Sequence, residues 1–183
     1  MNVVLLGLIA GNVEGLMGGL FQMLSHGIVS GALFFAVGTI YERYSVRSIK
    51  YFGGLTFFYP LFALVFLIFS MANISFPLTS SFVGEFMIFM GLYQHSFWAT
   101  FFAATSMVLG AIYTLWTYNR VFFGNIRSVS LTSFKDLDRK EMALFSVLII
   151  SLFLMGINSS MILDPMLFDC ITTLEHAKAG RVL

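Results

Sequence analysis

A single carboxylate inside an apolar stretch is the residue of this sequence best suited to chemistry. Glu85 is the only acidic residue between Glu42 and Asp136, and it lies in the apolar run 82–88. Ionising a carboxylate there is costly unless a partner or water stabilises the charge. The N-terminus of a half-helix expected at 82–93 would favour the ionised form. These opposed effects predict a group that loads and releases a proton. The alternative is a permanent structural ion pair with a neighbouring helix.

A polar stripe on the first long apolar helix offers a second group that can carry protons. Gln22, His26 and Ser30 recur at i, i+4 and i+8, so they share one face of the helix expected at 16–41. Histidine titrates near physiological pH, and a row of hydrogen-bonding side chains could line a file of water. The alternative for His26 is an ordinary packing role. Weaker candidates for channel lining are four hydroxyl side chains, Ser81, Ser106, Tyr113 and Thr117.

Other kinds of chemistry find no support in the sequence. No second histidine or carboxylate lies at ligand spacing from His26 or Glu85, so no metal site is expected. The single cysteine, Cys170, excludes an internal disulfide framework. The net charge of +1 is too weak to suggest nucleic acid as a partner. No phosphate loop or dinucleotide fingerprint is present, so no cofactor site is expected in this chain.

Composition predicts an all-α integral membrane protein. The chain is 58% hydrophobic and only 10% charged, whereas soluble domains carry about 25% charged residues. We expect four to five transmembrane helices, one of them interrupted, in a single domain at 1–163 that is followed by a polar C-terminal tail at 164–183. The apolar stretches that support this expectation are 2–10, 16–41, 55–72, 82–93, 97–117 and 142–161.

The stretches 55–72 and 82–93 are best explained as one interrupted span. The second is about 12 residues long, roughly 18 Å of helix, and cannot cross a core of ~30 Å alone. Pro77 lies in the break at 73–81 and disfavours helix there. With one interrupted span, eight of the ten Lys and Arg residues fall on one side, whereas two full spans would divide them equally. The positive-inside rule therefore favours the interrupted span.

Two pairs of glycines on the helix at 16–41 and just before it are expected to pack helices closely. Gly15 with Gly19, and Gly27 with Gly31, follow the small-xxx-small pattern.

Several motifs together resemble the C-terminal half of chain 4 of proton-pumping NADH:ubiquinone oxidoreductase, respiratory complex I. These motifs are MLSHG at 23–27, YER at 41–43, PLTSSFVGEF at 77–86, GAIY at 110–113 and YNR at 118–120. The resemblance runs over nearly the whole chain and weakens after about residue 163. The related antiporter-like subunits of that complex typically carry lysine where this sequence has Glu85, so the carboxylate is diagnostic of chain 4.

The resemblance implies a fold and a set of roles. The fold is half of an antiporter-like subunit, which consists of two inverted repeats that each contain a broken helix. Glu85 is implied to be the terminal carboxylate of a proton channel, and His26 a member of a central hydrophilic axis. NADH, FMN, iron–sulfur clusters and ubiquinone are implied to bind other subunits. The implied partners are those subunits and membrane lipids, in the mitochondrial inner membrane or, alternatively, the bacterial plasma membrane.

The first half of such a subunit is missing from this sequence. A split gene, with a separate chain supplying the N-terminal half, is one explanation, and a degenerate fragment is the other. Two other functions are also compatible with the residues. One is a cation/proton antiporter or membrane hydrogenase subunit of the same superfamily, and the other is a non-conducting structural subunit.

Overall fold

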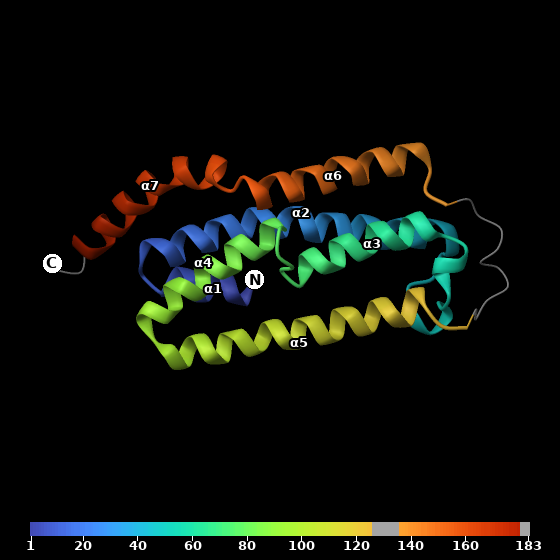
Figure 1. Cartoon of the computed structure of the whole chain (residues 1–183), viewed down its shortest axis with the longest axis horizontal. Coiled ribbons are helices and arrows are strands. Elements are labelled where there is room, and N and C mark those ends of the chain that lie inside the picture. Colours follow the sequence, from blue (N-terminus) through green and yellow to red (C-terminus); the bar gives the residue numbers. More distant parts are fainter. Residues whose placement is uncertain (126–135, 180–183) are drawn as a thin grey trace.

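The computed structural model describes residues 1–125 and 136–179, which form a bundle of α-helices around one long helix. This helix, α2 (Val13–Tyr44), has 32 residues. Its N-terminus is capped by Asn12, whose side-chain oxygen accepts a hydrogen bond of 2.9 Å from the backbone N–H of Gly15. It ends at Ser45, which takes a left-handed conformation with φ 53°. Most of the other helices pack directly against α2 (Figure 1).

An interrupted helix runs beside α2 in two pieces, α3 (Pro60–Asn73) and α4 (Ser80–His95). The pieces follow one another along α2 (Figure 1), which confirms the single interrupted span. The break contains Pro77 and two non-glycine residues with positive φ, Ser75 at 61° and Leu78 at 77°. Such backbone cannot continue an α-helix, because each reversal of φ redirects the next N–H and C=O groups.

The boundaries of the two pieces differ from those expected. The half-helix α4 has 16 residues and begins at Ser80, two residues before the expected start at 82. Glu85 therefore lies in its second turn, where the helix N-terminus has less influence than in the first turn. The stretch expected from 55 begins with a 3₁₀ turn at Leu55–Phe57, and α3 starts only at Pro60.

The described residues contain three helices that are long and apolar enough to cross a membrane, namely α2, α5 (Phe97–Phe122) and α6 (Arg139–Ile157). The interrupted pair adds a fourth crossing, and the short helix α1 (Asn2–Ile9) accompanies them. The expected class, an all-α membrane protein with four to five transmembrane helices including an interrupted one, is confirmed.

The described parts of the two charged loops, 42–50 and 119–141, lie at the same end of the bundle, as the charge distribution predicted. Arg43 at the end of α2 forms an ion pair of 2.6 Å with Glu141 at the start of α6. At the same end, the Thr56 hydroxyl donates a hydrogen bond of 2.7 Å to the carbonyl oxygen of Phe122. Three of the cations in the charge count, Arg127, Lys135 and Arg181, lie outside the described residues, as does the side chain of Lys178.

Helices α2 and α4 approach closely at glycines. A Cβ atom added to Gly18 would lie 2.8 Å from the backbone nitrogen of Ile88, and one added to Gly91 would lie 2.6 Å from that of Gly15. The expectation of close packing therefore holds at Gly15. Gly19 faces α1, where a Cβ atom would meet the Leu8 side chain at 3.3 Å.

The second glycine pair makes no close contact in the described chain. Cβ atoms added to Gly27 and Gly31 would have nothing within 4 Å. The expected packing role of these two glycines is therefore not observed within this chain. The reason is that their face of α2 points away from α1 and α4.

The C-terminal segment expected as a polar tail is helical. Helix α7 (Ser160–Ala179) begins before the expected division at 163, which therefore falls inside it. The helix packs on the N-terminal half of α2. Cys170, on its inner face, is only 2% exposed, and burial raises the pKa of its thiol.

Candidate proton-transfer site

A cavity of about 410 Å³ lies where the break meets α1, α2, α4 and α5. Its lining includes most of the side chains singled out from the sequence: Glu85, His26, Gln22, Ser81, Ser106 and Tyr113. At about 30 Å³ per molecule, it has room for on the order of ten waters. Residues that are up to 91 positions apart in the sequence therefore share one space that can be hydrated.

Two of the sequence candidates do not line this cavity. Ser30 lies one turn beyond His26 along α2, and the cavity ends before it. Thr117 lies one turn beyond Tyr113 on α5 and donates its hydroxyl to the Tyr113 carbonyl oxygen at 2.8 Å. The polar face of each helix thus extends further than the cavity does.

Glu85 enters the cavity from α4 and is half-buried. The side-chain amide of Gln22 donates a hydrogen bond of 3.4 Å to Glu85 Oε1. The ion pair found among the described residues joins Arg43 to Glu141 and does not involve Glu85. The alternative of a permanent ion pair at Glu85 therefore finds no partner in the described part of the chain.

The absence of a side chain at Gly84 leaves room for Gln22 beside Glu85. A Cβ atom added to Gly84 would lie 2.5 Å from Gln22 Oε1 and 3.0 Å from its Cα atom, so only glycine leaves room for this amide. Gln22 is 7% exposed, and its Oε1 atom has no hydrogen-bond partner in the described structure. A buried acceptor of this kind normally binds ordered water.

Hydrogen bonds among three buried serines connect the end of the break to α2. The Ser25 hydroxyl lies 2.7 Å from the Ser80 hydroxyl and 2.8 Å from the Ser81 hydroxyl. The pair on α4 occupies the first two positions of that helix. This cluster holds the start of α4 against α2, about one turn before Glu85. Sequence reasoning missed Ser25 and Ser80. The available signal was that Ser25 follows Gln22 by three residues and so shares its face of α2.

The arrangement can bind, hold and pass protons. It combines one carboxyl group, one imidazole, several hydroxyl groups and space for water beside irregular backbone. Irregular backbone is stable at membrane depth only within protein or beside water. The fold and the cavity thus define a multi-pass membrane protein with a half-buried carboxyl group at a helix break.

Residues 1–112 match the transmembrane family described as "NADH:quinone oxidoreductase/Mrp antiporter, TM". The chain belongs to this family. It is 42% identical over 178 residues to NADH-ubiquinone oxidoreductase chain 4 of Marchantia polymorpha, covering 97% of this chain and 36% of that relative. It is also 43% identical over 164 residues to NADH-quinone oxidoreductase subunit M of Rhodobacter capsulatus, covering 90% of this chain and 32% of that relative. The resemblance to chain 4 is confirmed, and the chain spans about a third of the length of these relatives.

Solved structures show the same arrangement of helices. A chain of respiratory complex I from Thermus thermophilus, a structure with bound NADH, superposes with a TM-score of 0.85 at 31% identity, over 94% of this chain and 37% of that chain. A chain of the Mrp complex from Dietzia sp. superposes with a TM-score of 0.78 at 20% identity, over 94% of this chain and 41% of that chain. At that identity, the second match shows a shared fold.

Proposed function

We propose that this chain forms part of the proton-translocating membrane subunit of an NADH:ubiquinone oxidoreductase, respiratory complex I. Within it, Glu85 is the key carboxylate of the distal proton half-channel. The observation that supports this role is the cavity beside the helix break, which Glu85 lines together with His26 and its hydrogen-bond partner Gln22. The names of the relatives support the proposal that the chain belongs to complex I.

Protons enter the cavity along the His26 face of α2 and reach Glu85 through water and the hydroxyl groups. They leave toward the end of the bundle where α4 ends at His95. Water in the cavity stabilises the ionised carboxylate, which would otherwise be too costly beside the apolar residues of α4. Gln22 positions the carboxyl group through its hydrogen bond.

Electron transfer takes place elsewhere in the proposed assembly. NADH, FMN, the iron–sulfur clusters and ubiquinone bind other subunits, and the protonation of Glu85 is coupled to them electrostatically. The enzyme activity, NADH:ubiquinone reduction with proton translocation, therefore belongs to the whole complex.

The proposed partners are the other subunits of complex I, membrane lipids, and a separate chain that supplies the N-terminal half of the subunit. The exposed apolar surfaces of α5 and α6 support the proposal of such partners. Only 6% of the spanning window of α5 and 11% of that of α6 are buried within the described chain. Such surface faces lipid or further helices. The proposed location is the mitochondrial inner membrane, and a bacterial plasma membrane is the alternative.

Replacement of Glu85 tests the function. Glu85→Gln keeps the shape of the side chain and removes the titrating group. We expect normal assembly and normal NADH oxidation with an artificial acceptor, with a loss of at least about tenfold in quinone reductase turnover and proton pumping. Glu14→Gln is a matched control, because Glu14 lies outside the cavity and contacts Gln94 at the end of the bundle.

Wild-type pumping by Glu85→Gln, with unchanged stoichiometry, would refute the proposed role and favour a non-conducting structural subunit. If Glu85→Gln does not assemble, Glu85→Asp becomes the deciding variant. It retains the acid, and we expect an intermediate rate because its carboxyl group reaches less far by one methylene.

A cation/proton antiporter or membrane hydrogenase subunit is the second candidate. The family description, which names the Mrp antiporter beside the oxidoreductase, favours considering it. Purification of the native assembly separates the candidates. Complex I predicts NADH oxidation by the purified assembly, whereas an antiporter predicts cation-dependent proton exchange without it.

A further inference from the structure

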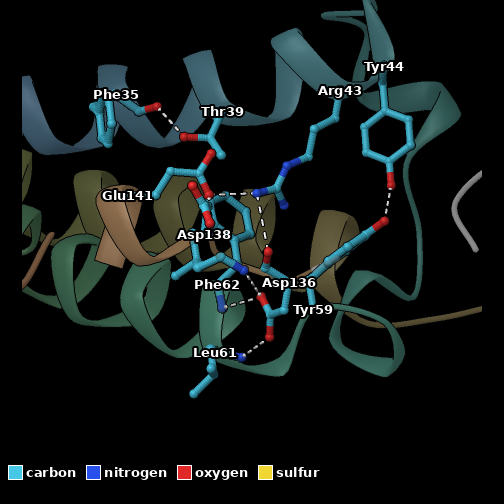
Figure 2. A network of polar contacts seen from close by, with 11 residues as sticks. Phe35, Thr39, Arg43, Tyr44, Tyr59, Leu61, Phe62, Asp136, Asp138 and Glu141 are labelled. Atoms are coloured by element: carbon cyan, nitrogen blue, oxygen red, sulfur yellow. Dashed lines mark hydrogen bonds and ion pairs between the residues drawn. The ribbon is translucent and has the colours of Figure 1, made fainter. Parts of the chain in front are cut away.

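The N-terminus of α3 is capped by a residue from a distant part of the chain. The carboxylate of Asp136 accepts hydrogen bonds from the backbone N–H groups of Leu61 at 3.0 Å and Phe62 at 3.3 Å (Figure 2). Tyr59, the residue that precedes α3, provides no side-chain cap. Pro60 has no N–H group, so Leu61 and Phe62 carry the first free donors of this helix.

Asp136 is itself held in place by the starts and ends of neighbouring helices. Its carboxylate also accepts from the backbone N–H of Leu137 at 2.8 Å, and its carbonyl oxygen accepts from Arg43 at 3.4 Å. Arg43 forms the 2.6 Å ion pair with Glu141, which in turn accepts from the backbone N–H of Asp138 at 2.8 Å (Figure 2). This network joins the end of α2 to the starts of α3 and α6.

The partners in this network are partly withdrawn from solvent. The side chains of Arg43 and Glu141 are 15% and 20% exposed. Screening by salt and water is weaker at such sites than at an open surface. The network is therefore suited to holding Asp136 in one position rather than letting it sample many.

The far end of α3 leads into the cavity of Glu85. Asn73, the last residue of α3, and the following Ile74 both line the cavity. With 14 residues, α3 is about 21 Å long and spans the distance between Asp136 and the cavity. Because the break disconnects α3 from α4, the position of α3 along α2 depends on its packing and on how its N-terminus is held.

We propose that Asp136 is a positioning residue for proton transfer at Glu85. By capping α3 from outside that helix, it fixes the depth at which Asn73 and Ile74 line the cavity. This inference rests on the proposed function. It goes beyond it by assigning a role to a loop residue at the charged end of the bundle, on the opposite end of α3 from the cavity.

Variants of Asp136 in the assembled complex test the inference. The measured quantity is the ratio of quinone reductase turnover to turnover with an artificial acceptor, which corrects for the amount of complex. We expect Asp136→Ala to lower this ratio about three- to tenfold, in line with the loss of a helix cap. Asp136→Asn keeps a capping oxygen and is expected to retain at least about half of the ratio.

Asp164→Ala is the matched control. It removes an exposed carboxylate on α7, outside the network at the start of α3. We expect its ratio to stay near the wild-type value. If Asp136→Ala does not assemble, Asp136→Ser decides. Its hydroxyl oxygen is bonded to Cβ rather than to Cγ, so it reaches less far toward Leu61 and Phe62 than the Oδ1 atom that Asn retains, and we expect a ratio at least about twofold below wild type.

Three results would overturn the inference: a wild-type ratio in Asp136→Ala or in its replacement Asp136→Ser, equal losses in Asp136→Ala and Asp164→Ala, or no rescue in Asp136→Asn. Failure of the proposed function itself is distinguished by Glu85→Gln. If Glu85→Gln is inactive while Asp136→Ala keeps the wild-type ratio, only the positioning role is wrong.

Discussion

At the scale of single residues, the proposed site requires that the Glu85 carboxyl group can gain and lose a proton in an apolar environment. Glu85 has a neutral amide partner, Gln22, rather than a cation. A neutral partner leaves the charge of the carboxyl group free to change, whereas a close cation would hold it ionised. His26 lines the same cavity and makes no direct hydrogen bond to Glu85 in the described structure, so water would have to connect the two.

Replacement of His26 should have a smaller effect than replacement of Glu85. In a hydrated path, water can take the place of an imidazole as a hydrogen-bonding relay. We expect His26→Ala to lower quinone reductase turnover about two- to fivefold, compared with at least about tenfold for Glu85→Gln. Ser30→Ala, on the same face but outside the cavity, should behave as wild type. Equal losses in His26→Ala and Ser30→Ala would contradict a specific role for the imidazole.

At the scale of helices, the break is held from several directions. Ser25 on α2 bonds both serines at the start of α4. Gly156 of α6 packs directly on the break, because a Cβ atom added there would overlap the carbonyl oxygen of Leu78. Backbone with two positive φ values is costly to maintain. These contacts stabilise that backbone beside the cavity.

The close approach of α2 and α4 makes Gly84 sensitive to substitution. Gly84→Ala places a methyl group against Gln22, including its backbone Cα atom, so the two helices must separate. We expect a destabilisation of about 1–3 kcal/mol and a loss of quinone reductase activity as Gln22 leaves Glu85. The measurement is thermal inactivation of the assembled complex. Gly38→Ala is the control, because a Cβ atom at Gly38 would have nothing within 4 Å in this chain; equal inactivation temperatures would refute the argument.

At the scale of the whole molecule, the positions of the charged loops define two ends of the bundle. The loops after α2 and around the start of α6 meet at one end, whereas α4 ends and α5 begins at the other (Figure 1). Because lysine and arginine collect on the cytoplasmic or matrix side, the first end is expected to face that compartment. The apolar surfaces of α5 and α6 lie between the two ends.

Cysteine labelling in sealed membranes tests this sidedness. In a Cys170→Ser background, Ser48→Cys and Asn125→Cys should react with a membrane-impermeant maleimide from one face, and His95→Cys from the opposite face. All three native residues are exposed in the described structure. Labelling of Ser48→Cys and Asn125→Cys from opposite faces would contradict the single interrupted span.

Composition, charge distribution and helical periodicity were sufficient to predict the class of fold, the interruption and six of the residues that line the cavity. These features depend on short-range rules. Apolar length determines whether a segment can span, a proline within it marks a break, and a spacing of four residues places Gln22 and His26 on one face. Helix ends were less well predicted: α4 starts earlier than expected and α7 extends through the expected tail.

The contacts between distant segments were decided only by the tertiary structure. Ser25 contacts Ser80 across 55 residues, and Asp136 caps Leu61 across 75. Periodicity identifies the face on which a side chain lies, but it does not specify which helix packs against that face or at what depth. Depth depends on the close approach of α2 and α4 at their glycines and on the capping of α3, both of which arise only when the helices pack together.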